Sequence, residues 1–149
     1  MPLIYYWRSD NYYRDLDEGA SYHLNQRNST LHELELGDSL WAFTRRSDGT
    51  YVLAAELIVK TKTFNPPSFE YGPYRIWGDL EKSRYFRLEG QKSIEPIIRS
   101  LSLKPTARYL GQAFQGNAAV RRIDSEAHLI LAEAARNLTL EPRAHLLPE

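Results

Sequence analysis

A pair of apolar runs joined by a short polar turn constrains the fold of this chain more than any other stretch. The pair lies between Leu36 and Lys62, and Asp48-Gly49 occupies the turn between the two runs. Asp-Gly tolerates the positive φ angles of a tight reversal, and a second backbone breaker, Gly37, precedes the first run. This arrangement predicts a β-hairpin.

The expected hairpin is apolar on both faces. In the first run Trp41 and Phe43 fall on one face and Leu40 and Ala42 on the other, while the run from Val52 to Ile58 is apolar at nearly every position. A hairpin buried on both faces requires further strands and helices around it. We therefore expect it at the centre of a closed or nearly closed small β-barrel.

The composition favours one soluble domain and excludes several kinds of site. The chain has 149 residues, of which 42% are hydrophobic and 26% charged, enough for a single core. It has no cysteine, which removes disulfides, thiolate catalysis and cysteine-rich zinc sites. No apolar run approaches the ~18 residues of a membrane span. We therefore expect a cytoplasmic protein that has no membrane partner.

The charges cancel overall but are unevenly distributed. Lysine and arginine number 19, as do aspartate and glutamate, so the formal net charge is zero. This balance argues against a protein that only clamps phosphates, because such proteins are strongly basic. Basic residues nevertheless gather at Arg45-Arg46, Lys60 to Lys62, Lys82 to Arg87 and Arg121-Arg122.

Turn residues and periodicity predict shorter elements on either side of the hairpin. We expect strands at Leu3 to Trp7, Arg84 to Glu89 and Val120 to Ile123, and short helices at Asn11 to Glu18, Leu31 to Leu36 and Ser93 to Leu101.

The stretch from Thr63 to Asp79 predicts a long loop, since three prolines and two glycines disfavour regular structure over most of it. The loop is rich in rings, with Phe64, Tyr74 and Trp77 among them. Such a loop is either held against the body of the domain or part of a binding surface.

A final helix should begin at Asp124, whose carboxylate is a suitable N-cap. Its expected buried stripe consists of Ala127, Ile130, Leu131 and Ala134. Residues 138–149 read as a C-terminal extension or a linker to a downstream domain, so the expected domain spans residues 1–137.

The order of several short motifs resembles a known family. Arg8-Ser9-Asp10 ends the first strand, an asparagine-bearing loop runs from Tyr22 to Asn28, and a Leu-Gly-Asp turn opens the aromatic strand Leu36 to Phe43. Ala54-Ala55-Glu56 and the acid-capped final helix follow. This order resembles the EVE branch of the PUA-like superfamily, related to YTH domains, and in particular the N-terminal reader domains of modification-dependent HNH restriction endonucleases.

The resemblance extends over roughly Ile4 to Ala135 and implies both a fold and a function. The implied fold class is α+β, a single PUA-like, EVE-type domain with a small mixed β-barrel flanked by short helices. The implied function is recognition of a modified base, 5-methylcytosine or 5-hydroxymethylcytosine in DNA, by flipping it into an aromatic pocket. The implied partners are modified DNA and a fused or separate nuclease domain. A YTH-like reader of modified RNA is the alternative.

A flipped base needs flat apolar surfaces together with hydrogen-bonding groups aimed at its edge. The side chains expected to bind the base are Ser9, Asp10, Tyr22, Asn25, Asn28, Trp41 and Trp77. Those expected to hold phosphates around it are Arg8, Arg45, Arg46, Lys60, Lys62, Arg75 and Arg84.

Several of these residues also fit a purely structural role. Trp41 lies in the middle of a strand and suits the core equally well. Ser9 and Asp10 can cap the following helix, and Asn25 and Asn28 can bond their own loop backbone.

A catalytic site is a weaker interpretation of the same chain. Asp38, Glu56 and Lys60 follow an order loosely like that of metal-dependent nucleases, but their spacing is longer than such sites usually have. The sequence contains no Gly-rich phosphate loop, nucleophile elbow or HExxH motif, and its histidines show no metal-ligand spacing. We therefore expect a reader without catalysis or a cofactor.

Overall fold

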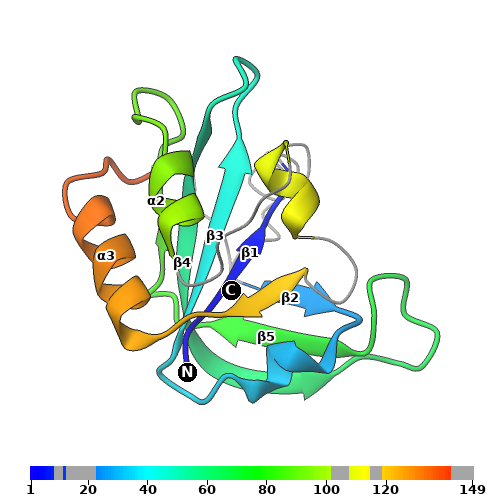
Figure 1. The fold of residues 1–149 in the computed structure, drawn as a ribbon. Coiled ribbons are helices and arrows are strands. Elements are labelled where there is room, and N and C mark those ends of the chain that lie inside the picture. The colour runs from blue at the N-terminus through cyan, green and yellow to red at the C-terminus, as the bar shows by residue number, and fades with distance from the viewer. Residues whose placement is uncertain (9–11, 13–22, 102–107, 115–118, 142–149) are drawn as a thin grey trace.

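The computed structural model describes residues 1–8, 12, 23–101, 108–114 and 119–141. One long strand, β4 (Tyr51–Phe64), joins the two parts of a curled sheet (Figure 1). Its first half pairs with β3 (Ser39–Arg45) and β6 (Arg84–Tyr85), and its second half pairs with β5 (Tyr74–Gly78). The strand changes partners at a register shift between Val59 and Thr61. An irregularity of this kind bends a strand.

The remaining strands extend the sheet at both ends. The order is β2-β5-β4-β3-β1-β7, with β1 at Leu3–Tyr6, β2 at His23–Gln26 and β7 at Val120–Arg122. The pair β1 and β3 is parallel, whereas the other pairs are antiparallel. The described part of the chain is thus a small mixed α+β domain with a curled, half-barrel sheet.

Two α-helices and two 3-10 helices accompany the sheet in the described residues. The α-helices are α2 (Glu95–Ser100) and α3 (Ser125–Ala135), and the 3-10 helices are η1 (Ser29–Glu33) and η2 (Leu110–Ala113). Helices α2 and α3 lie side by side along the outer face of β3 and β4 (Figure 1).

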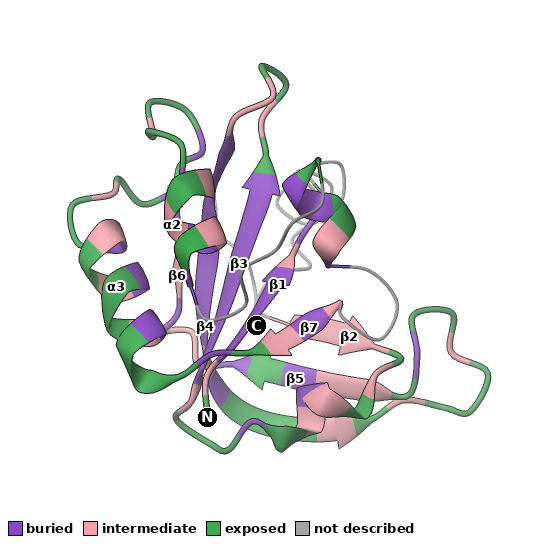
Figure 2. Ribbon diagram, in the orientation of Figure 1, coloured by how far each residue is buried: buried purple, intermediate pink, exposed green. Residues whose placement is uncertain are grey.

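The predicted hairpin is confirmed, and so is its burial on both faces. Strands β3 and β4 pair around Gly49, which has a φ of 89°. Leu40 and Ala42 face the apolar cluster inside the curl, while Trp41 and Phe43 face the second cluster beneath α2 and α3. Figure 2 shows β3 buried along almost its whole length.

The structure divides the expected loop from Thr63 to Asp79. Residues 65–73 form a loop, but β4 continues through Phe64 and β5 begins at Tyr74. The prolines of this stretch are confined to the loop, at positions Pro66, Pro67 and Pro73. The aromatic residues that flank the loop belong to strands β4 and β5. The result is a β4–β5 hairpin that the sequence did not predict.

The strands predicted at Leu3 to Trp7, Arg84 to Glu89 and Val120 to Ile123 are present with shorter bounds. The helix predicted from Leu31 to Leu36 is the 3-10 helix η1, and the helix predicted from Asn11 to Glu18 lies outside the described residues except for Tyr12. Strand β6 has two residues where six were expected, and the helix expected from Ser93 to Leu101 covers six residues. Backbone pairing continues past β6, because Phe86 bridges Leu140 and Arg87 N donates to Thr139 O. Residues 139–141 thus contact the body of the domain.

The final helix is capped as predicted, since Asp124 Oδ1 accepts a hydrogen bond from Ala127 N at 2.7 Å. Its buried stripe is Ala127, Leu131 and Ala135. The prediction that Ile130 belongs to this stripe is wrong, because 39% of its surface is exposed. The true stripe follows a strict four-residue spacing, one turn apart on the same side of the helix.

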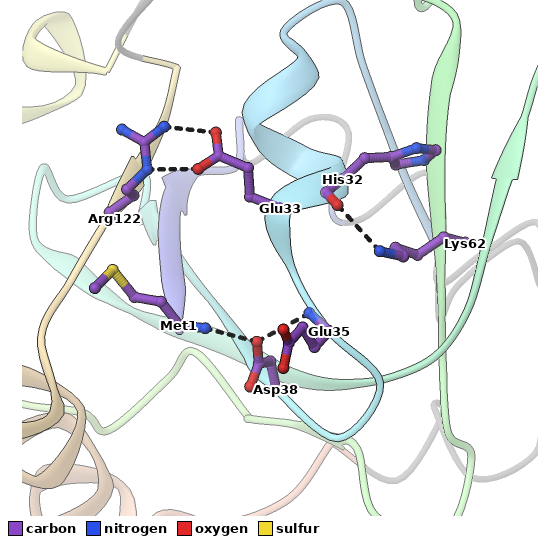
Figure 3. A network of polar contacts seen from close by, with 7 residues as sticks. All are labelled: Met1, His32, Glu33, Glu35, Asp38, Lys62 and Arg122. Carbon is purple, nitrogen blue, oxygen red and sulfur yellow. Dashed lines mark hydrogen bonds and ion pairs between the residues drawn. The ribbon is translucent and has the colours of Figure 1, made fainter.

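Polar contacts fix η1 against the strands around it (Figure 3). Arg122 on β7 donates two hydrogen bonds to Glu33, at 2.7 and 2.5 Å. Lys62 Nζ donates to His32 O at 3.1 Å. In the segment that follows η1, Asp38 accepts from the Met1 amine at 2.8 Å. The buried Leu31 side chain then completes the attachment of η1 to the inner core.

Gly72 controls how the β4–β5 loop meets β2. Its φ is 102°, and a Cβ there would lie 2.5 Å from Gln26 O and 2.6 Å from Arg27 N. We expect Gly72→Ala to lower the free energy of unfolding in urea well beyond the ~1–2 kcal/mol of a left-handed residue alone. The control is Gly37→Ala, where φ is 93° and nothing lies within 4 Å. Equal losses in the two variants would contradict the proposed overlap.

The Glu33–Arg122 pair should contribute to the acid sensitivity of the fold. Hydrogen bonds from Arg122 hold the pKa of Glu33 below its ordinary value of 4.5, although desolvation opposes them. Because the folded-state pKa is the lower one, the stabilisation is present above pH 4.5 and is lost as the pH falls through the folded-state value. We expect Glu33→Gln to flatten the acid decline of unfolding free energy slightly. Arg122→Gln should have the same effect, and the double variant no further one.

Candidate nucleic-acid interface

One face of the β2-β5-β4 part of the sheet collects aromatic, basic and amide side chains. In β5, Ile76 points into the core, so its neighbours Arg75 and Trp77 lie on the opposite face. Pairing places His23 and Asn25 of β2 and Thr61 and Thr63 of β4 beside them. We call this set, His23, Asn25, Thr61, Thr63, Arg75 and Trp77, the Trp77 face.

Trp77 is the largest side chain of this face, and its ring is held in place at its edge. The indole Nε1 donates to Thr63 Oγ1 at 2.9 Å, and 38% of the residue is exposed. The Arg75 guanidinium lies 5.1 Å from the ring centroid, and the His23 ring 5.6 Å away. The indole is therefore an oriented, partly open aromatic surface.

Asn25 accepts two hydrogen bonds beside this ring. Its Oδ1 receives one from Arg75 Nε at 2.6 Å and one from Asn65 Nδ2 at 2.9 Å. Asn65 Nδ2 also donates to Gly72 O at 2.9 Å. The amide of Asn25 is thus fixed by both the neighbouring strand and the β4–β5 loop.

The β4–β5 loop closes over one end of the Trp77 face. The ring of Phe69 lies 5.2 Å from the Arg75 guanidinium, on the side chain that also contacts Trp77. Arg27 donates to Glu70 O at 2.5 Å, and Gly72 packs on the backbone of Gln26. The loop is consequently joined to β2, and the Arg75 guanidinium contacts the rings of both Phe69 and Trp77.

The structure places Trp41 in the core. Trp41 is fully buried in the cluster beneath α2 and α3, and its Nε1 donates to His128 Nδ1 at 3.0 Å. A ring with no exposed surface cannot stack on a base, so the structural interpretation of Trp41 holds. Trp41 and Trp77 were both predicted to bind the base, but the two rings lie in different environments and do not form one site.

Asn28 also has a structural role. Its side chain caps η1 by accepting a hydrogen bond from Thr30 N at 3.0 Å. Ser9, Asp10 and Tyr22 lie outside the described residues.

The predicted phosphate-binding residues are divided among several environments. Arg75 lies on the Trp77 face, and Lys60 is exposed at the adjoining bend of β4. Arg84 forms an ion pair with Glu56 at 2.7 Å, and Lys62 is bonded to η1.

The other three arginines lie elsewhere. Arg46 bonds Leu88 O at 3.1 Å and Asp48 at 3.2 Å. Arg45 lies near the rings of Tyr51 and Tyr109, and Arg8 is exposed beyond β1.

The acidic residues of the nuclease-like set have partners in the fold. Glu56 accepts from Ser39 Oγ at 2.6 Å in addition to its ion pair with Arg84. Asp38 accepts from Glu35 N at 2.9 Å and from the Met1 amine. Across the described ranges, no group of three or more histidine or carboxylate side chains is arranged to hold a metal ion.

An open apolar groove of about 450 Å³ lies elsewhere, between α2 and α3. It is lined by Ile97, Glu126, Leu129, Ile130, Glu133 and Ala134. Among the described residues, none of those predicted for base or phosphate binding lines this groove.

Sequence reasoning missed several residues of the Trp77 face or next to it. His23, Asn65 and Thr63 contact Trp77 or Asn25, but none was predicted as a site residue. The alternation of Arg75, Ile76 and Trp77 was a usable signal for a half-buried strand. Recognising it would have placed Thr63 opposite Arg75 across a β4–β5 hairpin.

Comparisons with known proteins leave the family open. No family model matches the chain, and no curated protein matches it. Within the described residues, no helix has the length and apolar character needed to span a membrane.

Proposed function

We propose that this domain binds nucleic acid and recognises a modified base, 5-methylcytosine or 5-hydroxymethylcytosine in DNA, without catalysing a reaction. The observation that carries the proposal is the exposed, edge-anchored indole of Trp77 beside Arg75 and the amide of Asn25. The ordered motifs that resemble EVE domains support the same function.

Stacking is the interaction that the Trp77 face is best suited to make. A base that leaves its duplex loses its stacking partners, and an aromatic side chain replaces one of them. The bond to Thr63 and the contact with Arg75 orient the indole before any ligand arrives. Little side-chain entropy would then be lost on binding.

The modification would add contact area to such a stacked base. A 5-methyl group contributes roughly 0.8 kcal/mol when it leaves water, about a fourfold preference over unmodified cytosine. The Phe69 ring, held near Arg75, offers apolar surface beside the stacking position. Arg75 supplies positive charge close to the ring, where a flanking phosphate would lie.

Trp77→Ala should weaken binding without unfolding the domain. We expect a loss of about 1–3 kcal/mol in affinity for a short oligonucleotide containing 5-methylcytosine, measured by fluorescence anisotropy. The matched control is Phe64→Ala, which removes a ring that is 74% exposed and contacts His32 and Tyr74 instead. Lower thermal stability with unchanged affinity in Trp77→Ala would assign the indole a structural role and contradict the proposal.

Repeating this titration with RNA of matched sequence tests whether the site binds DNA or RNA more tightly. Only a site that touches the 2′-hydroxyl should prefer RNA. Tighter binding to modified DNA than to modified RNA supports the proposed substrate, and the reverse order supports the YTH-like alternative.

The salt dependence of binding should be shallow. The chain has a net charge of zero, and several of its arginines are engaged within the fold. For a single-stranded probe we expect log K to fall against log salt with a slope of about −2 or shallower, equivalent to two or three phosphate contacts. A slope several times steeper would indicate a phosphate-clamping surface rather than a stacking site.

A further inference from the structure

We propose that Asn25 determines specificity by acting only as a hydrogen-bond donor, so that the site prefers a base with an acceptor at ring position 3. This inference rests on the proposed function and sharpens it. Among pyrimidines, such a base is cytosine or 5-methylcytosine, whose N3 accepts, rather than thymine or uracil, whose N3 carries a proton.

The orientation of the Asn25 amide follows from the chemistry of its partners. The oxygen and nitrogen of an amide differ little in shape, but Arg75 Nε can only donate a hydrogen bond. The Asn25 atom 2.6 Å from Arg75 Nε must therefore be the oxygen. Rotating the amide by 180° would bring two donors together.

The Asn65 amide is oriented by the same reasoning. Its nitrogen lies 2.9 Å from the Gly72 carbonyl oxygen, which can only accept. That nitrogen also lies 2.9 Å from Asn25 Oδ1. Asn25 Oδ1 thus receives two donors, one for each of its lone pairs, and has no remaining capacity for a ligand.

The remaining polar atom of Asn25 is its nitrogen, with two N–H groups. Among the described residues, none accepts a hydrogen bond from Asn25 Nδ2. The Asn25 amide is therefore left with donors only, because Arg75 and Asn65 occupy its oxygen.

The position of Asn25 fits contact with the edge of a base stacked on Trp77. Asn25 pairs with Arg75, and Trp77 is two residues further along β5 on the same face. Diagonal neighbours of this kind are roughly 7–8 Å apart, about the width of a pyrimidine ring plus a hydrogen bond. A base lying over the indole would therefore direct one edge toward Asn25 Nδ2.

The test compares two bases that share the 5-methyl group and differ at positions 3 and 4. Anisotropy titrations use short oligonucleotides that contain either 5-methylcytosine or thymine at one position. We expect the wild-type protein to prefer 5-methylcytosine. In Asn25→Asp, this preference should fall at least fivefold, because a carboxylate keeps the acceptor for Arg75 and Asn65 but replaces the donors with an oxygen.

Thr61→Asp is the matched control. Thr61 is exposed on the same face and pairs with Trp77, so the variant adds the same charge without changing Asn25. Both variants should weaken binding to the two oligonucleotides through repulsion of phosphates, but Thr61→Asp should leave their ratio unchanged. Urea unfolding of Asn25→Asp checks that the domain still folds.

The possible results separate this inference from the proposed function. An unchanged ratio in Asn25→Asp, an equal change in Thr61→Asp, or no preference in the wild-type protein would overturn the assignment of Asn25. If Trp77→Ala still weakens binding in those cases, the stacking function stands and only the assignment of Asn25 fails. If Trp77→Ala binds as tightly as the wild type, the proposed function itself fails.

Discussion

Burial of both faces of the β3–β4 hairpin is the constraint on which the rest of the structure depends. Each large apolar side chain that leaves water contributes about 1.5–3 kcal/mol, and β3 carries such side chains on both faces. One face can be covered only if the sheet curls over it, and the other only if helices pack on it. The bend of β4 and the docking of α2 and α3 provide these two coverings.

The same bend creates the candidate interface. Beyond Val59, β4 leaves the doubly buried region and pairs with β5, so that one face of the sheet there covers the core while the other carries Arg75 and Trp77. Only the inner face of this part contributes to the core, through residues such as Ile76. Side chains on the outer face are therefore available for contact with a ligand.

The sequence predicted the elements whose signals are local. The Asp-Gly turn, the alternation in β3 and the Asp124 cap each depend on a few adjacent residues, and all three are present. The β4–β5 hairpin was missed because its three prolines were read as breaking the whole stretch rather than its turn alone. For the site, Asn25, Arg75 and Trp77 were chosen individually and meet on one face. Trp41 suited the base site and the core equally well from the sequence, and its full burial on a strand covered on both faces places it in the core.

Strand β4 forms the buried hairpin with its first half and supports the indole of Trp77 with its second half. Substitutions that alter recognition therefore fall in a different part of the strand from those that alter folding. Residues 51–59 are almost entirely buried, whereas residues 60–64 are mostly exposed. Thr61 and Thr63, together with residues of the 65–73 loop other than Asn65 and Gly72, can thus be varied in a library while the core-forming half of β4 is kept. The domain therefore has the layout of a scaffold on which new binding specificities can be selected.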